Sequence, residues 1–82
     1  MNYLDKELHE YQDSLTYPDK LWLVVYPDLE YWSEPTTDRH EAEMTYWQAK
    51  DEGENVEFGW IWDGNLTSRW IDNIRQFRPV NL

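Results

Sequence analysis

Cysteine is absent from this chain of 82 residues, and histidine occurs only twice, as His9 and His40. Without cysteine the chain has no disulfide, no thiolate zinc site and no thiol nucleophile. Such a composition is typical of a reducing compartment, and we expect a cytoplasmic protein. The two histidines belong to no recognised metal-ligand spacing. We therefore expect two ordinary surface histidines and neither a metal nor a cofactor.

Glycine is scarce, and long apolar runs are missing. Gly53, Gly59 and Gly64 form no phosphate-binding loop, and no serine lies in a nucleophile-elbow motif. No stretch approaches the roughly 18 apolar residues of a membrane span, and residues 1–15 lack the apolar core of a signal peptide. Paired carboxylates occur, but in so acidic a chain a solvated surface explains them better than catalysis. We expect a binding protein and no enzyme.

Aromatic residues are plentiful instead, because the chain has six tryptophans, six tyrosines and two phenylalanines. A chain this short makes one domain, here residues 1–82, and buries only about 60% of its unfolded surface. Each aromatic side chain buries roughly 150–250 Å². The rings therefore enlarge a small core, and some of them are expected at the surface. We assign Trp22, Tyr46, Phe58 and Trp60 to the core.

Cations are few: seven lysines and arginines face 17 acids, for a net charge of −10. Residues 1–66 carry −12, whereas residues 67–82 carry +2 from Arg69, Arg75 and Arg78 against Asp72. This charge disfavours nucleic acid and anionic membranes and speeds encounter with basic proteins. Plain solubility explains the acidity equally well. The arginines either neutralise the end of a last helix or dock on the acidic face of a second copy, as in a homodimer.

Hydrophobic periodicity predicts the first three elements. Apolar residues at positions 4, 8, 11 and 15 fall on one stripe of a helix over about residues 2–15. The apolar run 21–26, rich in β-branched and aromatic residues, predicts a central strand. A turn at Pro27-Asp28 then returns the chain as a second strand over residues 29–33.

A second helix is expected from Asp38 to about Glu52. Asp38 and Glu41 suit a reciprocal cap of the capping-box kind, and Gly53 suits the left-handed residue that ends a helix. Small apolar residues at positions 42 and 49, with Tyr46, form its inward stripe.

The last third of the chain predicts a strand and a helix. Residues 56–62 alternate with period two, which is the clearest strand pattern in the chain. A tight turn at Asp63-Gly64 precedes a last helix to about residue 77, with Thr67 or Ser68 as its cap. A fourth strand over residues 66–72 is the alternative.

The order of elements is α-β-β-α-β-α. We therefore expect an α+β fold of two layers, with a three-stranded antiparallel sheet and helices packed mainly on one face. The uncovered face would then carry tryptophan or tyrosine side chains, because residues 21–26 are apolar on both sides of the strand.

The middle of the chain combines carboxylates with indoles. Between residues 28 and 57, ten acids face only Arg39 and Lys50. Helix-borne carboxylates can stand in for phosphates, and tryptophans are enriched at interface hot spots. The candidate partner-binding residues are Glu30, Glu34, Asp38, Glu41, Glu43, Asp51, Glu52, Glu54, Trp32, Trp47 and Trp62. We expect Trp32, Trp47 and Trp62 to be exposed anchors.

These features favour an acidic protein-binding inhibitor. In size, acidity and lack of catalytic groups, the chain resembles the small inhibitors that phages and mobile elements encode against restriction, CRISPR or DNA-repair enzymes. The resemblance is one of kind, with no shared motif, and implies a basic nucleic-acid-binding protein as partner. One alternative is an immunity protein against a basic toxin. Another is a small adaptor that self-associates through an aromatic sheet face.

Overall fold

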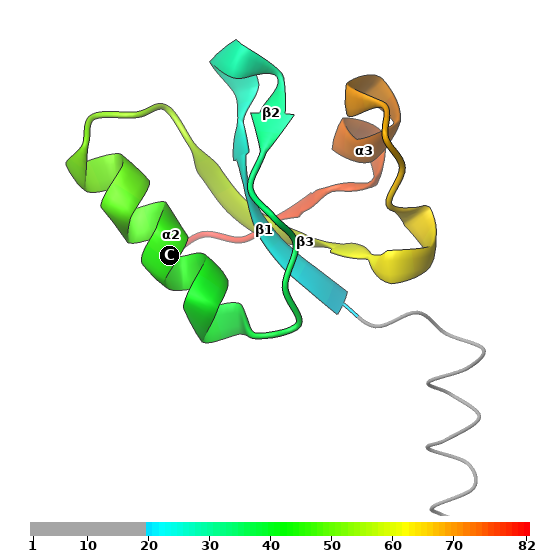
Figure 1. Ribbon diagram of the computed structural model, residues 1–82, viewed down its shortest axis with the longest axis horizontal. Helices are drawn as coiled ribbons and strands as arrows, with labels where there is room; N and C mark the ends of the chain where they lie inside the picture. The colour runs from blue at the N-terminus through cyan, green and yellow to red at the C-terminus, as the bar shows by residue number, and fades with distance from the viewer. Residues whose placement is uncertain (1–19) are drawn as a thin grey trace, which may run out of the picture.

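The computed structural model describes residues 20–82. Its elements are β1 (Lys20–Tyr26), η1 (Pro27–Leu29), β2 (Tyr31–Trp32), α2 (Arg39–Asp51), β3 (Glu57–Trp62), η2 (Asp63–Asn65), α3 (Trp70–Gln76) and β4 (Arg78–Pro79), where η marks a short 3-10 helix. The helix expected over residues 2–15 lies outside the described residues. The part that is described forms an α+β fold with one antiparallel sheet and two α-helices (Figure 1).

The strand order in the sheet is β2-β1-β3-β4. β1 and β3 form its centre and pair antiparallel from Lys20 opposite Trp62 to Val25 opposite Glu57. The strands predicted over residues 21–26 and 56–62 are confirmed. The sheet has four strands, however, and the prediction of three was wrong.

The two edge strands are short. β2 was expected over residues 29–33 but has two residues, because η1 occupies Pro27–Leu29 and Ser33 interrupts regular pairing. The Ser33 amide donates to the Val24 carbonyl at 2.8 Å, while its hydroxyl accepts from the Val24 amide at 2.9 Å. A side-chain oxygen thus replaces the backbone carbonyl as acceptor. β4 is the additional strand, and it pairs with β3 through Gly59 opposite Pro79.

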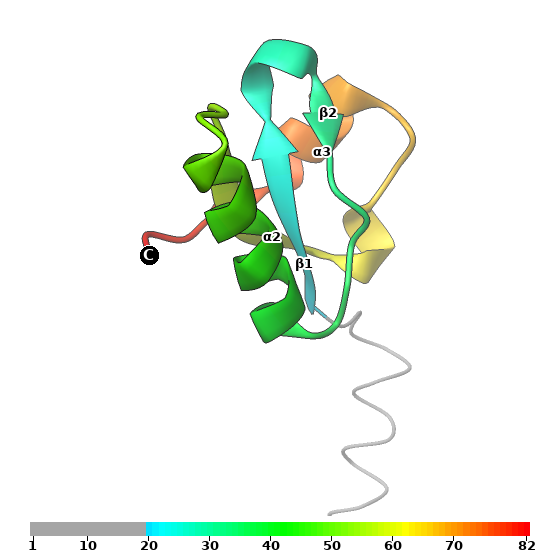
Figure 2. The same ribbon diagram turned by 60° about the vertical axis from the view of Figure 1, so that its left-hand side comes forward.

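The two helices lie on opposite faces of the sheet (Figures 1 and 2). One core cluster packs under α2 and includes Val24 and Phe58. The other packs under α3 and includes Leu23, Val25 and Ile61. The expectation of helices mainly on one face was wrong, because successive residues of a strand point to opposite faces and β1 is apolar on both.

α2 begins and ends as its sequence predicts. The Asp38 carboxylate accepts hydrogen bonds from the amides of His40 and Glu41, and Gly53 follows the helix with a φ of 84°. The reciprocal half of the cap differs, because the Glu41 carboxylate accepts from the Thr36 hydroxyl at 3.4 Å. The inward stripe is confirmed: Ala42 and Ala49 are buried, and Tyr46 packs against the same core cluster.

α3 confirms the predicted last helix, and the alternative of a strand over residues 66–72 was wrong. Its first residue is Trp70, and Arg69 occupies the cap position without a side-chain cap bond. Thr67, two residues before the cap position, holds the start of the helix instead. Its hydroxyl accepts a hydrogen bond from the Arg69 amide and donates one to the buried Asn73 side chain.

Within residues 20–82, no helix is long and apolar enough to cross a membrane.

Candidate protein-binding surfaces

The solvent side of α2 carries two exposed apolar side chains among carboxylates. Met44 is 59% exposed and Trp47 is 52% exposed. Both lie away from the inward stripe of the helix, since residues advance by about 100° each. Glu41 and Glu43 lie on the same helix before them, and Asp51 ends it. We call these five residues the outer face of α2.

The carboxylates near α2 form two groups. Asp38, Glu41 and Glu43 lie at its N-terminal end, while Asp51, Glu52 and Glu54 lie at its C-terminal end. A helix rises about 1.5 Å per residue, so Glu41 and Asp51 are about 15 Å apart along the axis. Part of the predicted acidic stretch therefore lies on and beside α2, as two groups with Met44 and Trp47 between them.

Cations of the described chain neutralise little of this charge. Among residues 20–82, two ion pairs lie within 4 Å, namely Arg39 with Glu43 at 3.2 Å and Arg69 with Asp72 at 3.6 Å. Both are exposed pairs within one helical turn, of a kind that contributes only about 0.3–0.5 kcal/mol. The Arg39 guanidinium also lies 4.9 Å from the centre of the Trp22 ring.

A second acidic region surrounds the β1–β2 hairpin. Tyr26 and Tyr31 pair across the strands with ring centres 5.6 Å apart. Burial raises the pKa of the Tyr26 phenol, and Tyr31, Glu54 and Glu52 raise it further. The Asp28 carboxylate accepts a hydrogen bond from the Asn55 side chain at 3.3 Å. The hairpin tip thus lies against the acidic C-terminal end of α2.

The hairpin also holds two further candidate acids, Glu30 and Glu34, both of which are exposed. Glu30 has a left-handed backbone with a φ of 49° and follows η1. This conformation is uncommon for a residue other than glycine. It ends the 3-10 turn, because the Glu30 amide donates back to the Pro27 carbonyl.

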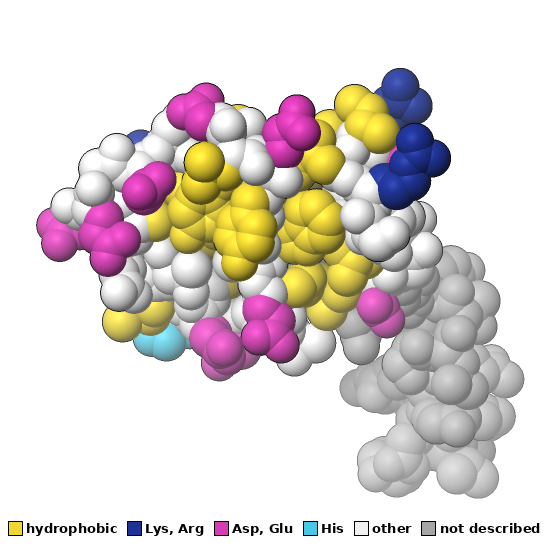
Figure 3. All heavy atoms as spheres, turned by 45° about the horizontal axis from the view of Figure 1, so that its top comes forward, with side chains coloured by type: hydrophobic (Ala, Val, Ile, Leu, Met, Phe, Trp, Pro, Cys, Tyr) yellow, Lys and Arg dark blue, Asp and Glu magenta, His cyan; other side chains and the backbone are white. Residues whose placement is uncertain are grey.

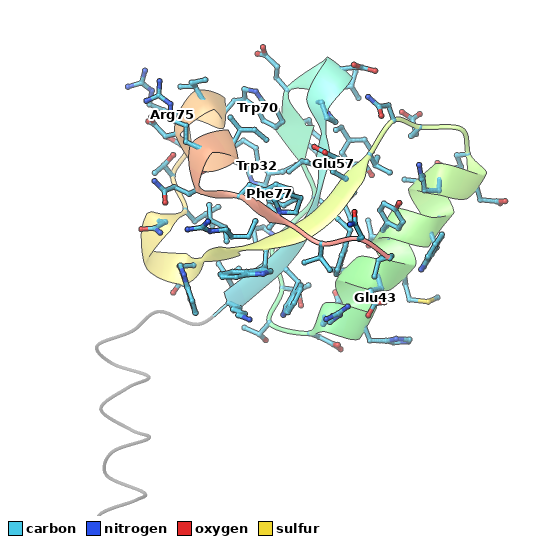
Figure 4. The ribbon with its side chains drawn as sticks, turned by 180° about the vertical axis from the view of Figure 1, so that it is seen from behind. Trp32, Glu43, Glu57, Trp70, Arg75 and Phe77 are labelled. Carbon is cyan, nitrogen blue, oxygen red and sulfur yellow. The ribbon has the colours of Figure 1, made fainter. Side chains whose placement is uncertain are left out.

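The three candidate indoles occupy different environments. Trp47 is exposed, as expected. Trp32 is half-buried and stacks on Trp70 with ring centres 6.2 Å apart, and Figure 4 shows both beside Phe77 between α3 and the sheet. Trp62 is half-buried and meets Trp60 edge to face at 4.8 Å. The expected exposure is therefore observed for Trp47 and only in part for Trp32 and Trp62, while their role as anchors stays a prediction.

The core assignment of the other rings was right for Phe58 and partly right for the half-buried rings. Phe58 is buried, and Trp22 and Tyr46 pack against its cluster. Trp60 is half-buried at the edge of that face, where the Lys20 ammonium lies 4.4 Å from its ring centre.

Among residues 20–82, several exposed apolar residues were not predicted as candidates, including Leu29, Tyr31, Met44 and Ile71. A signal existed for Met44, because it lies two residues beyond the inward Ala42 and so points away from the sheet. The sequence contains no such signal of exposure for Leu29 and Tyr31, because both fall within the longer strand predicted over residues 29–33.

The described residues offer no arrangement for metal chemistry. Within residues 20–82, no three histidine or acidic side chains are placed to hold a metal ion. A small apolar cavity between α3 and the sheet is lined by residues of the core, including Leu23, Trp32 and Phe77.

Comparisons with protein-family models, with curated proteins and with solved structures found no match for this chain.

Proposed function

We propose that this chain is an acidic inhibitor, of the kind that phages and mobile elements encode, which binds a basic nucleic-acid-binding protein through the outer face of α2. The observation that carries the proposal is the exposure of Met44 and Trp47 between two groups of carboxylates. Buried aromatic anchors supply affinity at interfaces, while surrounding charge speeds encounter and selects the partner. A cationic surface with an apolar recess is the complementary partner.

The spacing of the carboxylates favours a partner that normally holds a nucleic-acid backbone. The roughly 15 Å between Glu41 and Asp51 spans about four phosphate steps of one DNA strand, at about 3.4 Å of axis each. Cations that contact several phosphates over this length can contact the two carboxylate groups of α2 instead. Binding would then block nucleic acid by competition.

The charge on this face remains available to a partner. Of its three acids, Glu43 is held by Arg39, and that pair is exposed and easily exchanged. Lys50, the other cation of the helix, lies 5.8 Å from the Tyr46 ring centre. A complex would therefore release counterions from the partner and weaken as salt rises.

Competition with DNA tests the proposal. Targets are captured from a bacterial lysate at low salt, identified by mass spectrometry and purified separately. The purified target is then titrated with labelled DNA at several fixed concentrations of the chain. We expect the apparent Kd for DNA to rise in proportion to the chain concentration. A complex that leaves DNA affinity unchanged contradicts the proposal.

A matched pair of variants locates the surface. Trp47→Ala with Asp51→Lys and Glu52→Lys alters the outer face of α2 and its C-terminal end. Asp63→Lys with Asp72→Lys makes the same change in net charge on η2 and α3, away from α2. We expect the first variant to lose competition by at least about 30-fold, which corresponds to about 2 kcal/mol, and the second to lose little. Equal losses would mean that net charge alone drives binding.

A further inference from the structure

A separate face of the molecule combines apolar side chains with charges of both signs. Leu29 is 65% exposed and Tyr31 is 56% exposed on the hairpin, and Ile71 is 47% exposed on α3. The half-buried stack of Trp32 on Trp70 connects the two elements. Tyr31 lies on the α2 side of the sheet beside Tyr26, whereas Trp32 lies on the α3 side with Val25, so these residues surround the β2 edge of the sheet from both sides. We call the five residues the hairpin face. Figure 3 shows hydrophobic side chains gathered across the middle of the molecule, with acidic side chains along the edge of this apolar region.

The two ends of the hairpin face carry opposite charge. At the hairpin end, Asp28 and Glu30 flank Leu29, and Glu54 lies close to Tyr26. At the α3 end, basic side chains gather beyond the hydrophobic ones (Figure 3). Arg69 occupies the cap position of α3, and Arg75 follows Ile71 by one turn on the same side of the helix.

Ile71 and Arg75 are both exposed on α3, and Arg75 also lines a shallow hollow with Asn65 and Gln76. The helix is held to the preceding loop, because Asn65 donates to Gln76 at 3.2 Å and Asn73 donates to the Thr67 carbonyl at 2.9 Å. Figure 4 shows Arg75 pointing away from the body of the protein, beyond Trp70. Its guanidinium forms no ion pair within 4 Å among residues 20–82.

From this arrangement we infer that the hairpin face binds a second copy of the chain in a two-fold symmetric dimer. A two-fold interface brings the same patch of both subunits together in opposite directions. The basic α3 end of each copy then meets the acidic hairpin end of the other, and the apolar middles meet each other. A uniformly basic partner would be repelled at the α3 end, so charge complementarity favours a second copy on this face.

The dimer leaves Met44 and Trp47 accessible, although its acidic end includes Glu54 beside the C-terminal end of α2. Met44 and Trp47 are exposed on α2, and α2 lies apart from α3 across the sheet (Figure 2). The inference therefore does not depend on the proposed function. It also compensates for the small core, since an 82-residue chain gains stability by burying surface against a second copy.

Sedimentation equilibrium of the full chain tests the inference. At low salt, between about 1 μM and about 1 mM, we expect a concentration-dependent dimer. Leu29→Ser with Tyr31→Ala should weaken it by at least about 30-fold, because truncation of central apolar anchors costs more than 1–2 kcal/mol. The matched control, Met44→Ser with Trp47→Ala on the outer face of α2, should leave the dimer intact. A chain that stays monomeric throughout this range contradicts the inference, as does a dimer lost only in the control.

Charge exchange provides a test that does not depend on folding of the apolar variant. Arg75→Glu should weaken the dimer by about tenfold, since the contact occurs twice by symmetry. Glu54→Arg should weaken it similarly, and the two changes combined in one chain should restore it. Additive loss in the combined variant would overturn the assigned orientation.

Discussion

At the scale of single residues, Tyr26 gives the structure a measurable dependence on pH. Burial raises the pKa of its phenol above the ordinary value of 10.0, and Tyr31, Glu54 and Glu52 act in the same direction. The native state therefore holds the phenolic proton more tightly than the unfolded state. The resulting stabilisation is complete below the unfolded pKa and is lost as the pH rises through the folded pKa.

Replacing Tyr26 by phenylalanine removes this titration. We expect the free energy of unfolding of the native chain to fall as the pH rises above the ordinary phenol pKa of 10.0, and that fall to be shallower in Tyr26→Phe. Urea unfolding at a series of pH values measures both slopes. Identical slopes would show that the phenol has the same pKa in the two states.

Gly59 is the residue at which the sheet tolerates no side chain. A Cβ at this position would overlap the Arg78 carbonyl oxygen and lie 2.6 Å from the Phe77 ring. The overlap is with backbone, which cannot move aside without shifting β4. The close approach of β4 to β3 therefore depends on glycine.

We expect Gly59→Ala to lower the free energy of unfolding by about 1–3 kcal/mol, as overpacking in a close-packed region does. Gly53→Ala is the comparison, because Gly53 has open space around it and only its left-handed backbone opposes a side chain. That change should cost about 1 kcal/mol. Chemical denaturation measures both, and an equal or larger loss at Gly53 would contradict the close packing of β4.

At the scale of elements, α3 is held by a side-chain clamp at its start. The Asn73 side chain is buried and accepts from the Thr67 amide at 2.7 Å while donating to the Thr67 carbonyl at 2.9 Å. A seven-residue helix is too short to be stable alone in water. The clamp and the packing of Trp70 on Trp32 therefore keep it in place.

Removal of the clamp should be costly. Asn73→Ala is expected to lower the free energy of unfolding by about 1.5–3 kcal/mol, since it breaks several partly buried hydrogen bonds. Asn65→Ala breaks a single exposed bond to Gln76 and should cost less than about 0.5 kcal/mol. Thermal unfolding of the two variants compares them. Similar losses would mean that Asn73 contributes no more than a surface amide.

Local patterns were sufficient to predict β1, α2, β3 and α3. The start of α2 follows from Asp38 alone, and β3 follows from alternation over residues 56–62. β4 could not be found this way, because its two residues form a strand only where Gly59 lets them approach. Local patterns also did not predict which face of the sheet each helix covers, because β1 is apolar on both faces.

Site residues could be located where a single element fixes their exposure. Carboxylates on α2 follow from the helix itself, and so does exposed Trp47. The half-buried position of Trp32 was harder to predict, because it depends on contact with Trp70, almost forty residues later in the chain. Long-range pairing of rings leaves no signal in the local sequence.

At the scale of the whole molecule, charge separates two surfaces with different proposed partners. The outer face of α2 is acidic around Met44 and Trp47 and suits a cationic enzyme. The hairpin face is acidic at one end and basic at the other, and suits a second copy. The net charge of −10 speeds encounter with basic proteins in either state of assembly.

Salt dependence of the complex with the captured target tests the proposed function most directly. The Kd of the purified target is measured by calorimetry from about 50 mM to about 200 mM salt, for the native chain and for Trp47→Ala with Asp51→Lys and Glu52→Lys. We predict that native affinity falls by at least about tenfold over this range and that the variant binds weakly with a shallower slope. A native complex whose affinity is independent of salt, or a variant that binds as tightly as the native chain, would contradict phosphate mimicry by α2.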